Sequence, residues 1–283
     1  MLNKRTCNEL IDDNDKQIKE PTIVGEIRVG RRLYEKGFWD PMVPGYKNIV
    51  VLMPGSPIQT DELNYGMLGP YSLKNDREQI MENVWQFSRI WKQVPKTTQY
   101  YPRKRHIITW NHSAEIHMND NQELTNAYWN WREKGMNNKY FVRWPTGGKN
   151  MEEIQFAFRS EDVQPHTTII PNDYRLSYIE SRKKIYLPVY TSLVKKHPKF
   201  QELVNYHRSG ENLLIIEVDG PHEESLPYYK NKYDVNDTFI ENHTMLMTLE
   251  NNKIMINDDK HPWGHGYALA MAVANVDENE QWI

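Results

Sequence analysis

Runs of aliphatic residues bounded by turn residues predict β-strands in three parts of the chain. Residues 22–30 alternate apolar and polar side chains, which is typical of a half-buried strand. Residues 48–56 and 212–221 are more continuously apolar, and each has a glycine–proline pair near its end. We therefore expect two buried strands and one strand with a polar face.

Apolar residues at helical spacing predict a helix over residues 75–91. Asn75 and Glu78 have the spacing of an N-terminal capping box. One apolar stripe along this helix consists of Ile80, Val84, Phe87 and Trp91. The adjoining face is polar and consists of Glu82, Gln86 and Arg89. A polar face of this kind is typical of a solvated surface unless another segment of the chain meets it.

The middle of the chain predicts strands on both sides of a helix. Residues 106–120 have the pattern of a strand, and the following helix is expected to contain Trp129 and to end at Gly135. Residues 139–145 are then expected to form another strand. Residues 160–175 have the composition of a linker.

The second half of the chain predicts a long helical region and an insertion. Residues 176–204 are expected to be helical in two or three pieces, because Pro188 and Pro198 interrupt the pattern. Residues 222–255 have the pattern of an insertion with short helices of its own. With the strands above, these segments predict an α+β fold.

Composition limits the function classes. Of the 283 residues, 12% are aromatic, including 9 Trp and 17 Tyr, which suggests a chain that packs and binds with rings. A net charge of −3 gives no basis for broad nucleic-acid binding, so nucleic acid is expected only as a modified substrate. Residues 1–20 are charged and weakly periodic, and we expect them to form a flexible arm.

The cysteine content and the hydropathy pattern predict a soluble, cytoplasmic protein. The single cysteine, Cys7, excludes an intrachain disulfide and a thiolate-rich zinc site. The chain contains no apolar run near the roughly 18 residues that span a bilayer, so no membrane partner is expected. The amino-terminal residues also lack the apolar segment of a signal peptide.

Residues 257–273 are the first candidate for a functional site. The segment combines two carboxylates, two imidazoles and an indole: Asp258, Asp259, His261, His265 and Trp263. Pro262, Gly264 and Gly266 exclude a regular helix there, whereas the small apolar residues from Tyr267 onward favour one. A loop that leads into a helix presents backbone N–H groups to an anion such as a phosphate. The alternative is a tight turn before a core helix.

Two more segments carry candidate polar residues. The apolar strand over residues 212–221 ends in Glu217 and Asp219, and carboxylates at such a place face a cleft or are bound by partners.

The second segment contains His112, Glu115 and His117, which do not have the spacing of a metalloprotease motif. On an alternating strand His112 would point away from the other two side chains. A metal-dependent hydrolase built on these and the loop histidines is therefore the weakest interpretation, and no metal or cofactor is expected.

The order of these motifs resembles the NADAR (YbiA-like) superfamily. That family has a helix with E-H-x-x-Q-A-x-K, then L-x-E, then an aspartate followed by W-G-x-G and a helix with leucine and methionine. The matching residues are Glu82, Gln86, Glu217, Asp259 or its neighbour Asp258, Trp263, Gly264, Gly266, Leu269 and Met271. The resemblance covers about residues 64–92 and 176–275.

The resemblance implies a helix-rich single domain of YbiA-like type over residues 21–283. Extra strands are expected, with insertions at about residues 100–160 and 222–255. It also implies an N-glycosidic hydrolase that acts on a small-molecule ribosyl nucleotide or an ADP-ribosylated substrate. The candidate catalytic residues are Glu82, Asp259 and Glu217. The candidate substrate-binding residues are Gln86, Arg89, Trp263, Gly264, Gly266, Asp258 and Asp219.

One residue departs from the family pattern. Arg89 stands where the family has a lysine, and a guanidinium stays charged and cannot act as an amine nucleophile. Lys92, three residues further on, is an alternative source of the amine. Otherwise the chain would hydrolyse its substrate by direct attack of water, or bind a nucleotide without turnover. A third alternative is an interaction protein whose aromatic residues form an interface. The sequence does not indicate the oligomeric state.

Overall fold

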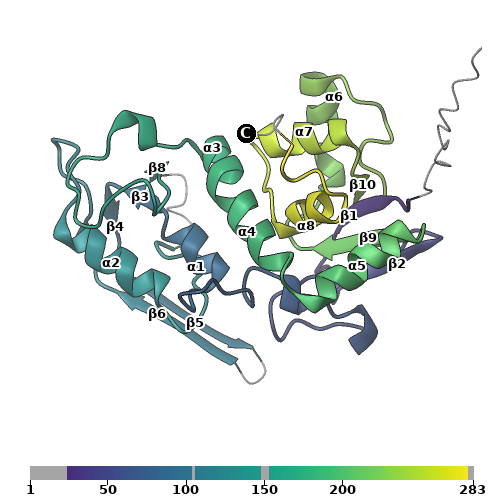
Figure 1. The fold of residues 1–283 in the computed structure, drawn as a ribbon, viewed down its shortest axis with the longest axis horizontal. Coiled ribbons are helices and arrows are strands. Elements are labelled where there is room, and N and C mark those ends of the chain that lie inside the picture. Colours follow the sequence, from purple (N-terminus) through teal and green to yellow (C-terminus); the bar gives the residue numbers. More distant parts are fainter. Residues whose placement is uncertain (1–23, 104–105, 148–152, 280–283) are drawn as a thin grey trace, which may run out of the picture.

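The computed structural model describes residues 24–103, 106–147 and 153–279, so the arm expected over residues 1–20 lies outside the described residues. The chain has an α+β fold with two parts (Figure 1). We call the part built on the four-stranded sheet the sheet lobe. The aromatic lobe is formed mainly by residues 87–170, which pack around a separate core. The short helix α1 (Met81–Gln86) lies where the two lobes meet.

The sheet of the sheet lobe has the strand order β10-β1-β9-β2. Its strands are β1 (Ile27–Arg31), β2 (Tyr46–Val50), β9 (Asn212–Glu217) and β10 (Thr244–Leu246). Strand β9 runs parallel to both β1 and β2, whereas β10 is antiparallel to β1. Residues 213–217 of β9 are fully buried, which explains their continuous aliphatic sequence. The three predicted strands are confirmed, although β1 and β2 are shorter than expected.

One face of this sheet is covered by helices (Figure 1). They are α4 (Leu187–Val194), α5 (Pro198–Arg208) and α8 (His265–Val273). Every residue of α8 is buried, and its alanines allow the helix to approach the strands closely. The helix predicted from Tyr267 onward is therefore confirmed, but it begins at His265, so the expectation that Gly266 excludes a helix is wrong.

A continuous helical segment leads into α4. It consists of α3 (Tyr178–Ser181), a π-helical turn (Arg182–Tyr186) and α4 itself. The predicted break at Pro188 is wrong, because this proline lies in the first turn of α4, where a missing N–H donor costs little. The break at Pro198 is confirmed, since that residue starts α5.

The aromatic lobe is built on α2 (Asn126–Met136) and three antiparallel pairs of strands. The pairs are β3 (Arg89–Trp91) with β8 (Ile154–Ala157), β4 (Gln93–Val94) with β7 (Glu115–Ile116), and β5 (Thr97–Arg103) with β6 (His106–His112). Its core consists largely of rings, among them Phe87, Trp91, Trp110, Tyr128 and Trp131. Rings of this size supply much buried area from few residues.

The helix predicted over residues 75–91 is shorter than expected, because only α1 is helical. The expected N-cap is wrong: Asn75 Oδ1 instead accepts hydrogen bonds from the backbone N–H groups of Arg77 and Gln79, which closes a turn. Glu78 in that turn has φ of 59°, a left-handed conformation that ends any regular helix. Arg89 consequently lies on strand β3.

The strand predicted over residues 139–145 is also wrong. The side chain of Asn83 occupies the hydrogen-bonding groups that a strand would need. Its Nδ2 donates to the carbonyls of Asn138 and Tyr140, and its Oδ1 accepts from the N–H of Val142. Residues 139–145 therefore have no regular secondary structure and are hydrogen-bonded to Asn83 of α1.

The segment over residues 222–255 belongs to the sheet lobe. It contains α6 (Leu226–Tyr233), the edge strand β10 and the start of α7 (Leu249–Asn257). Short 3-10 turns elsewhere are Asp61–Leu63, Gly66–Leu68, Asn172–Tyr174 and Glu223–Ser225. Among the described residues, none of the helices has the length and apolar character to cross a membrane.

Candidate functional site

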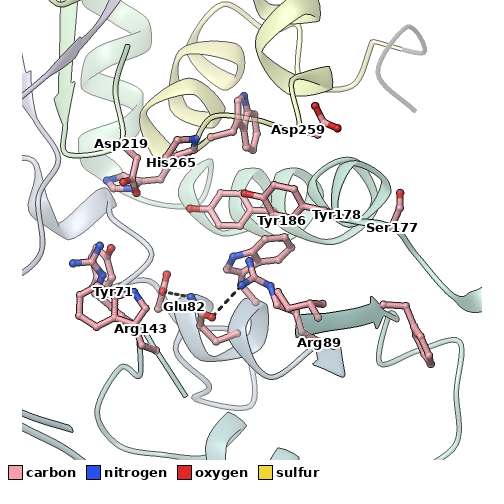
Figure 2. A pocket seen from close by; sticks show the side chains of 18 of the residues that line it. Tyr71, Glu82, Arg89, Arg143, Ser177, Tyr178, Tyr186, Asp219, Asp259 and His265 are labelled. Carbon is pink, nitrogen blue, oxygen red and sulfur yellow. Dashed lines mark hydrogen bonds between the residues drawn. The ribbon is translucent and has the colours of Figure 1, made fainter. Parts of the chain in front are cut away.

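A cavity of about 560 Å³ lies between the two lobes. Its walls come from α1, from residues 143–144 and 154–156, from the start of the α3 segment, from the loop after β9 and from the loop before α8 (Figure 2). These segments are far apart in sequence, so the fold itself assembles the cavity. The volume lies in the range of small-molecule sites.

Helix α1 places a line of polar side chains on one wall of the cavity. Gln86 Nε2 donates to Glu82 Oε1 at 2.9 Å, and Arg89 Nη1 donates to Gln86 Oε1 at 3.3 Å (Figure 2). Glu82 and Gln86 are one helical turn apart, which explains their contact. The polar face expected from the sequence is buried against the cavity, with Glu82 only 6% exposed.

Burial raises the pKa of the Glu82 carboxyl above its ordinary value. The hydrogen bond from Gln86 and the charges of Arg143 and Arg89 lower the pKa but do not cancel this effect. Asp219 raises it further. A carboxyl of this kind can hold a proton at a higher pH than an exposed glutamate and release it during a reaction.

Asp219 faces Glu82 from the opposite wall (Figure 2). It lies in the loop after β9 and is half-buried. Among the described residues no hydrogen bond or ion pair engages its carboxylate. The two carboxyl groups therefore share one cavity, and of the two only Glu82 is bonded to a neighbouring side chain.

Trp263 lines the cavity from the loop before α8 and is 6% exposed. Its ring lies edge-on to Tyr186 at 5.7 Å and stacks on Tyr267 at 6.3 Å between centroids. These contacts hold the indole in one orientation. Gly264, which follows it, also lines the cavity.

Glu217 does not line the cavity, within the part of the chain that the structure describes. It is fully buried beneath the first turn of α8, where the backbone N–H groups of Gly266 and Tyr267 face its carboxyl. A Cβ atom on Gly264 would lie 2.3 Å from Glu217 Oε2, and one on Gly266 would lie 2.7 Å from Oε1. The place at the helix N-terminus where the sequence suggested an anion is filled by the protein's own glutamate. Gly266 contacts this glutamate rather than the cavity.

His265 connects Glu217 to the sheet. Its Nε2 donates to the carbonyl of Val51, and its Nδ1 lies 3.3 Å from Glu217 Oε2. Burial raises the pKa of Glu217 well above its ordinary value and lowers the pKa of His265. His265 Nε2 carries the proton that it donates to Val51. One further proton is shared by His265 Nδ1 and the Glu217 carboxyl, and that proton resides on Glu217.

The adjacent aspartates Asp258 and Asp259 have opposite environments. Asp258 is fully buried and accepts hydrogen bonds at 2.7 to 2.8 Å from Tyr228, Tyr229 and His261. Asp259 lies on the cavity rim, 3.4 Å from the ammonium group of Lys232. Asp258 therefore positions the loop, and only Asp259 of the two reaches the cavity.

The histidines of the aromatic lobe lie elsewhere. His112 Nε2 and His117 Nε2 are each 3.6 Å from Glu115 Oε2, so the expectation that His112 points away is wrong. Strand β6 ends at His112, and the alternation does not continue through it. The described residues contain no group of three acidic, histidine or cysteine side chains that could hold a metal ion.

Comparisons with protein family models, with curated proteins and with solved structures found no match.

The cavity also contains residues that the sequence did not indicate. Tyr71 and Tyr186 line it, and burial raises the pKa of both hydroxyls well above the ordinary value, so they remain protonated donors. Arg143 enters from the aromatic lobe. Tyr71 and Arg143 lie in irregular segments, where no periodic pattern marks them. The π-helical turn that ends in Tyr186 has no signal in the sequence either.

Proposed function

We propose that this chain hydrolyses the N-glycosidic bond of a ribosyl nucleotide or of an ADP-ribosylated substrate. The observation that carries the proposal is the pair of carboxyl groups, Glu82 and Asp219, that face each other across a cavity with aromatic walls (Figure 2). Cleavage of a glycosidic bond needs two such groups in different protonation states.

The two carboxyl groups have different roles in this proposal. Glu82, whose pKa is raised by burial, donates a proton to the leaving nitrogen base. Asp219, which lacks partners among the described residues, faces the positive charge that develops on the ribose and orients the attacking water. Asp259, a candidate from the sequence, lies at the rim beside Lys232 and contacts the outer part of the substrate.

The aromatic walls suit a planar base. Trp263 and Tyr186 form one side of the cavity, and Trp85 lies on the α1 side. Rings at such positions stack on a base or cover a ribose, and they exclude water from the bond that is cleaved. The tyrosine hydroxyls of Tyr71 and Tyr186 are available to donate to ribose oxygens.

We also propose that the fold is of the YbiA-like, NADAR type. What supports this is that Glu82, Gln86, Trp263 and Gly264, which carry the resemblance in sequence, line the same cavity. In this chain Arg89 replaces the family's lysine, so no imine with the ribose is formed. The reaction proceeds by direct attack of water.

A second candidate function is nucleotide binding without turnover. The observation that favours it is Arg89 itself, which supplies a binding group where the family has a nucleophile. In that case Glu82 contributes to binding alone. The two candidates differ in whether a free base is released.

The test is incubation of the purified protein with a panel of ribosyl nucleotides and ADP-ribosylated oligonucleotides, followed by mass spectrometry of the products. Release of a free base by the wild type and not by Glu82→Ala supports hydrolysis. Binding of the same compounds without any released base by the wild type supports the second candidate and rejects the first.

A further inference from the structure

Arg89 is a buried cation without an ionic partner. Its side chain is 4% exposed, and within the described residues no carboxylate lies at ion-pair distance. Its one hydrogen bond goes from Nη1 to the neutral amide oxygen of Gln86, and Nε has no partner. Taking an unpaired charge out of water is costly unless other groups compensate.

The other buried arginines of the described residues are compensated by the chain. Arg32 forms a bidentate pair with Asp40, and Arg132 donates to the Phe87 carbonyl and to Ser160. Arg182 donates to the carbonyls of Asp258 and His261. Arg89 differs from all three because its environment lacks acceptors of this kind.

The location of Arg89 indicates which kind of group can compensate its positive charge. The guanidinium lies over the ring of Trp85 at 4.1 Å and lines the cavity next to Ser177 and Tyr178. Arg182 lies on the Tyr178 ring at 4.3 Å and adds positive potential to the same region. An acceptor for Arg89 therefore has to come from a molecule in the cavity, and that molecule has to be anionic.

We propose that Arg89 binds a phosphate monoester of the substrate, so that the site takes phosphorylated ribosyl compounds in preference to nucleosides. Nε is enclosed by the protein and Nη1 donates to Gln86, whereas Nη2 has no hydrogen-bond partner among the described residues and can donate to a phosphate oxygen. The ribosyl part of this inference rests on the proposed function, whereas the anion site rests on Arg89 alone.

The location of the phosphate also determines how the substrate is oriented in the cavity. Gln86 links Arg89 to Glu82, so a phosphate on Arg89 places the attached ribose next to the acidic group. The bond to the base then lies beside Glu82, and Asp219 faces the ribose from the opposite wall. Binding energy from a phosphate remote from the cleaved bond can be used to position that bond.

The test compares ribose 5-phosphate with ribose by isothermal titration calorimetry on the full chain, because neither sugar has an N-glycosidic bond for the proposed reaction to cleave. We expect ribose 5-phosphate to bind about tenfold to a hundredfold tighter, the range for charge-assisted hydrogen bonds. Arg89→Met is expected to remove this preference to within about twofold. Arg208→Met, which removes an exposed charge far from the cavity, is the matched control and keeps it.

Equal binding of the two sugars, or no binding of ribose 5-phosphate, overturns the inference. An unchanged preference in Arg89→Met also overturns it. If Arg89→Met does not fold, Arg89→Lys decides, since a lysine retains the charge but not the planar guanidinium and should keep part of the preference.

Failure of this inference is distinguishable from failure of the proposed function. Cleavage of a nucleoside and of its 5′-monophosphate with the same kcat/KM rejects the anion site and leaves hydrolysis intact. A phosphate preference in binding without any released base rejects hydrolysis and leaves the anion site intact.

Discussion

The α1 wall of the cavity contains the buried Glu82, whereas the buried Glu217 lies behind the α8 wall, beneath the first turn of that helix. The two glutamates differ in what surrounds them. Burial raises the pKa of both Glu82 and Glu217. The fold surrounds Glu217 with His265, two glycines and backbone N–H groups. Among the described residues, Glu82 has one side-chain hydrogen bond, from Gln86, and its carboxyl faces the cavity.

This difference separates a structural acid from a reactive one. A buried carboxyl that the chain encloses on all sides is part of the packed interior, so a change there disturbs the folded structure. A buried carboxyl that faces a cavity lacks protein contacts on that side, and a bound ligand has to provide them. The comparison therefore predicts that changes on the α1 wall affect activity and that changes on the α8 wall affect folding.

The largest expected effect is the loss of activity in Glu82→Gln. Glutamine keeps the contact with Gln86 but has no proton to donate, so kcat/KM should fall by about 10³-fold. The free energy of unfolding should change by less than about 1 kcal/mol. Both quantities are measured on the same preparation, by base release and by urea denaturation.

The matched control for this change is Glu217→Gln, which makes the same substitution on the α8 wall. A glutamine amide can still donate to His265 Nδ1, so kcat/KM should stay within about threefold of the wild type. An activity loss in Glu217→Gln as large as that in Glu82→Gln would remove the distinction between the two walls.

The second effect is the destabilisation caused by Gly264→Ala. The backbone there is extended, with φ of −112°, so the cost is steric: the new Cβ would lie 2.3 Å from Glu217 Oε2. The carboxyl is enclosed and cannot move aside freely. We expect a loss of about 2 to 3 kcal/mol in the free energy of unfolding, measured by urea denaturation.

A double-mutant cycle shows whether this cost arises from Glu217. In Glu217→Ala the carboxyl is absent, so the alanine at position 264 should cost about 1 to 2 kcal/mol less than in the wild type. Additive effects of the two substitutions would mean that Gly264 is required for another reason.

Sequence patterns identified the parts of the fold that depend on local periodicity. Strand β9 and helix α8 were predictable because a continuous aliphatic run and a run of small residues each fit one type of element. The shared face of Glu82 and Gln86 was predictable for the same reason. These elements position Glu82, Gln86 and His265, which are three of the polar residues that line the cavity.

The remaining errors come from contacts between distant residues. Arg89 was expected on a helix, but it pairs with Ala157 of β8, sixty-eight positions later in the chain. Residues 139–145 had a strand pattern, but the side chain of Asn83 takes their hydrogen bonds. Glu217 and Asp219 were both expected near a cleft, but β9 ends between them and only Asp219 lines the cavity.

The third prediction uses the neighbours Asp258 and Asp259, which no local pattern distinguishes. Asp258→Asn replaces an acceptor of three donated hydrogen bonds with an amide that also carries two N–H donors. This should cost about 2 kcal/mol in the free energy of unfolding. Asp259→Asn, at the exposed rim, should change it by less than about 0.5 kcal/mol. Equal effects in thermal or urea denaturation would show that the tyrosine contacts do not stabilise the loop.

The smallest effect concerns the proton that Glu217 and His265 share. The folded pair holds one proton over a wide pH range, because the pKa of Glu217 is raised from 4.5 and that of His265 is lowered from 6.5. The unfolded pair also holds one proton between pH 4.5 and 6.5, on the histidine. The contribution of this pair to stability is therefore flat within that window.

Outside this window the sign of the pH dependence follows from proton counts. Below pH 4.5 the unfolded pair binds a second proton, so stability falls as the pH falls. Above pH 6.5 the unfolded pair loses its proton while Glu217 keeps one, so stability falls as the pH rises. In Glu217→Gln the decline in stability above pH 6.5 is expected to be absent. Subtracting the free energy of unfolding of the variant from that of the wild type removes the contribution of Glu82, which is the same in both. We expect this difference to change by about 1 kcal/mol between pH 6.5 and 8 in urea denaturation. A constant difference would show that the folded pair, like the unfolded pair, loses its proton near pH 6.5.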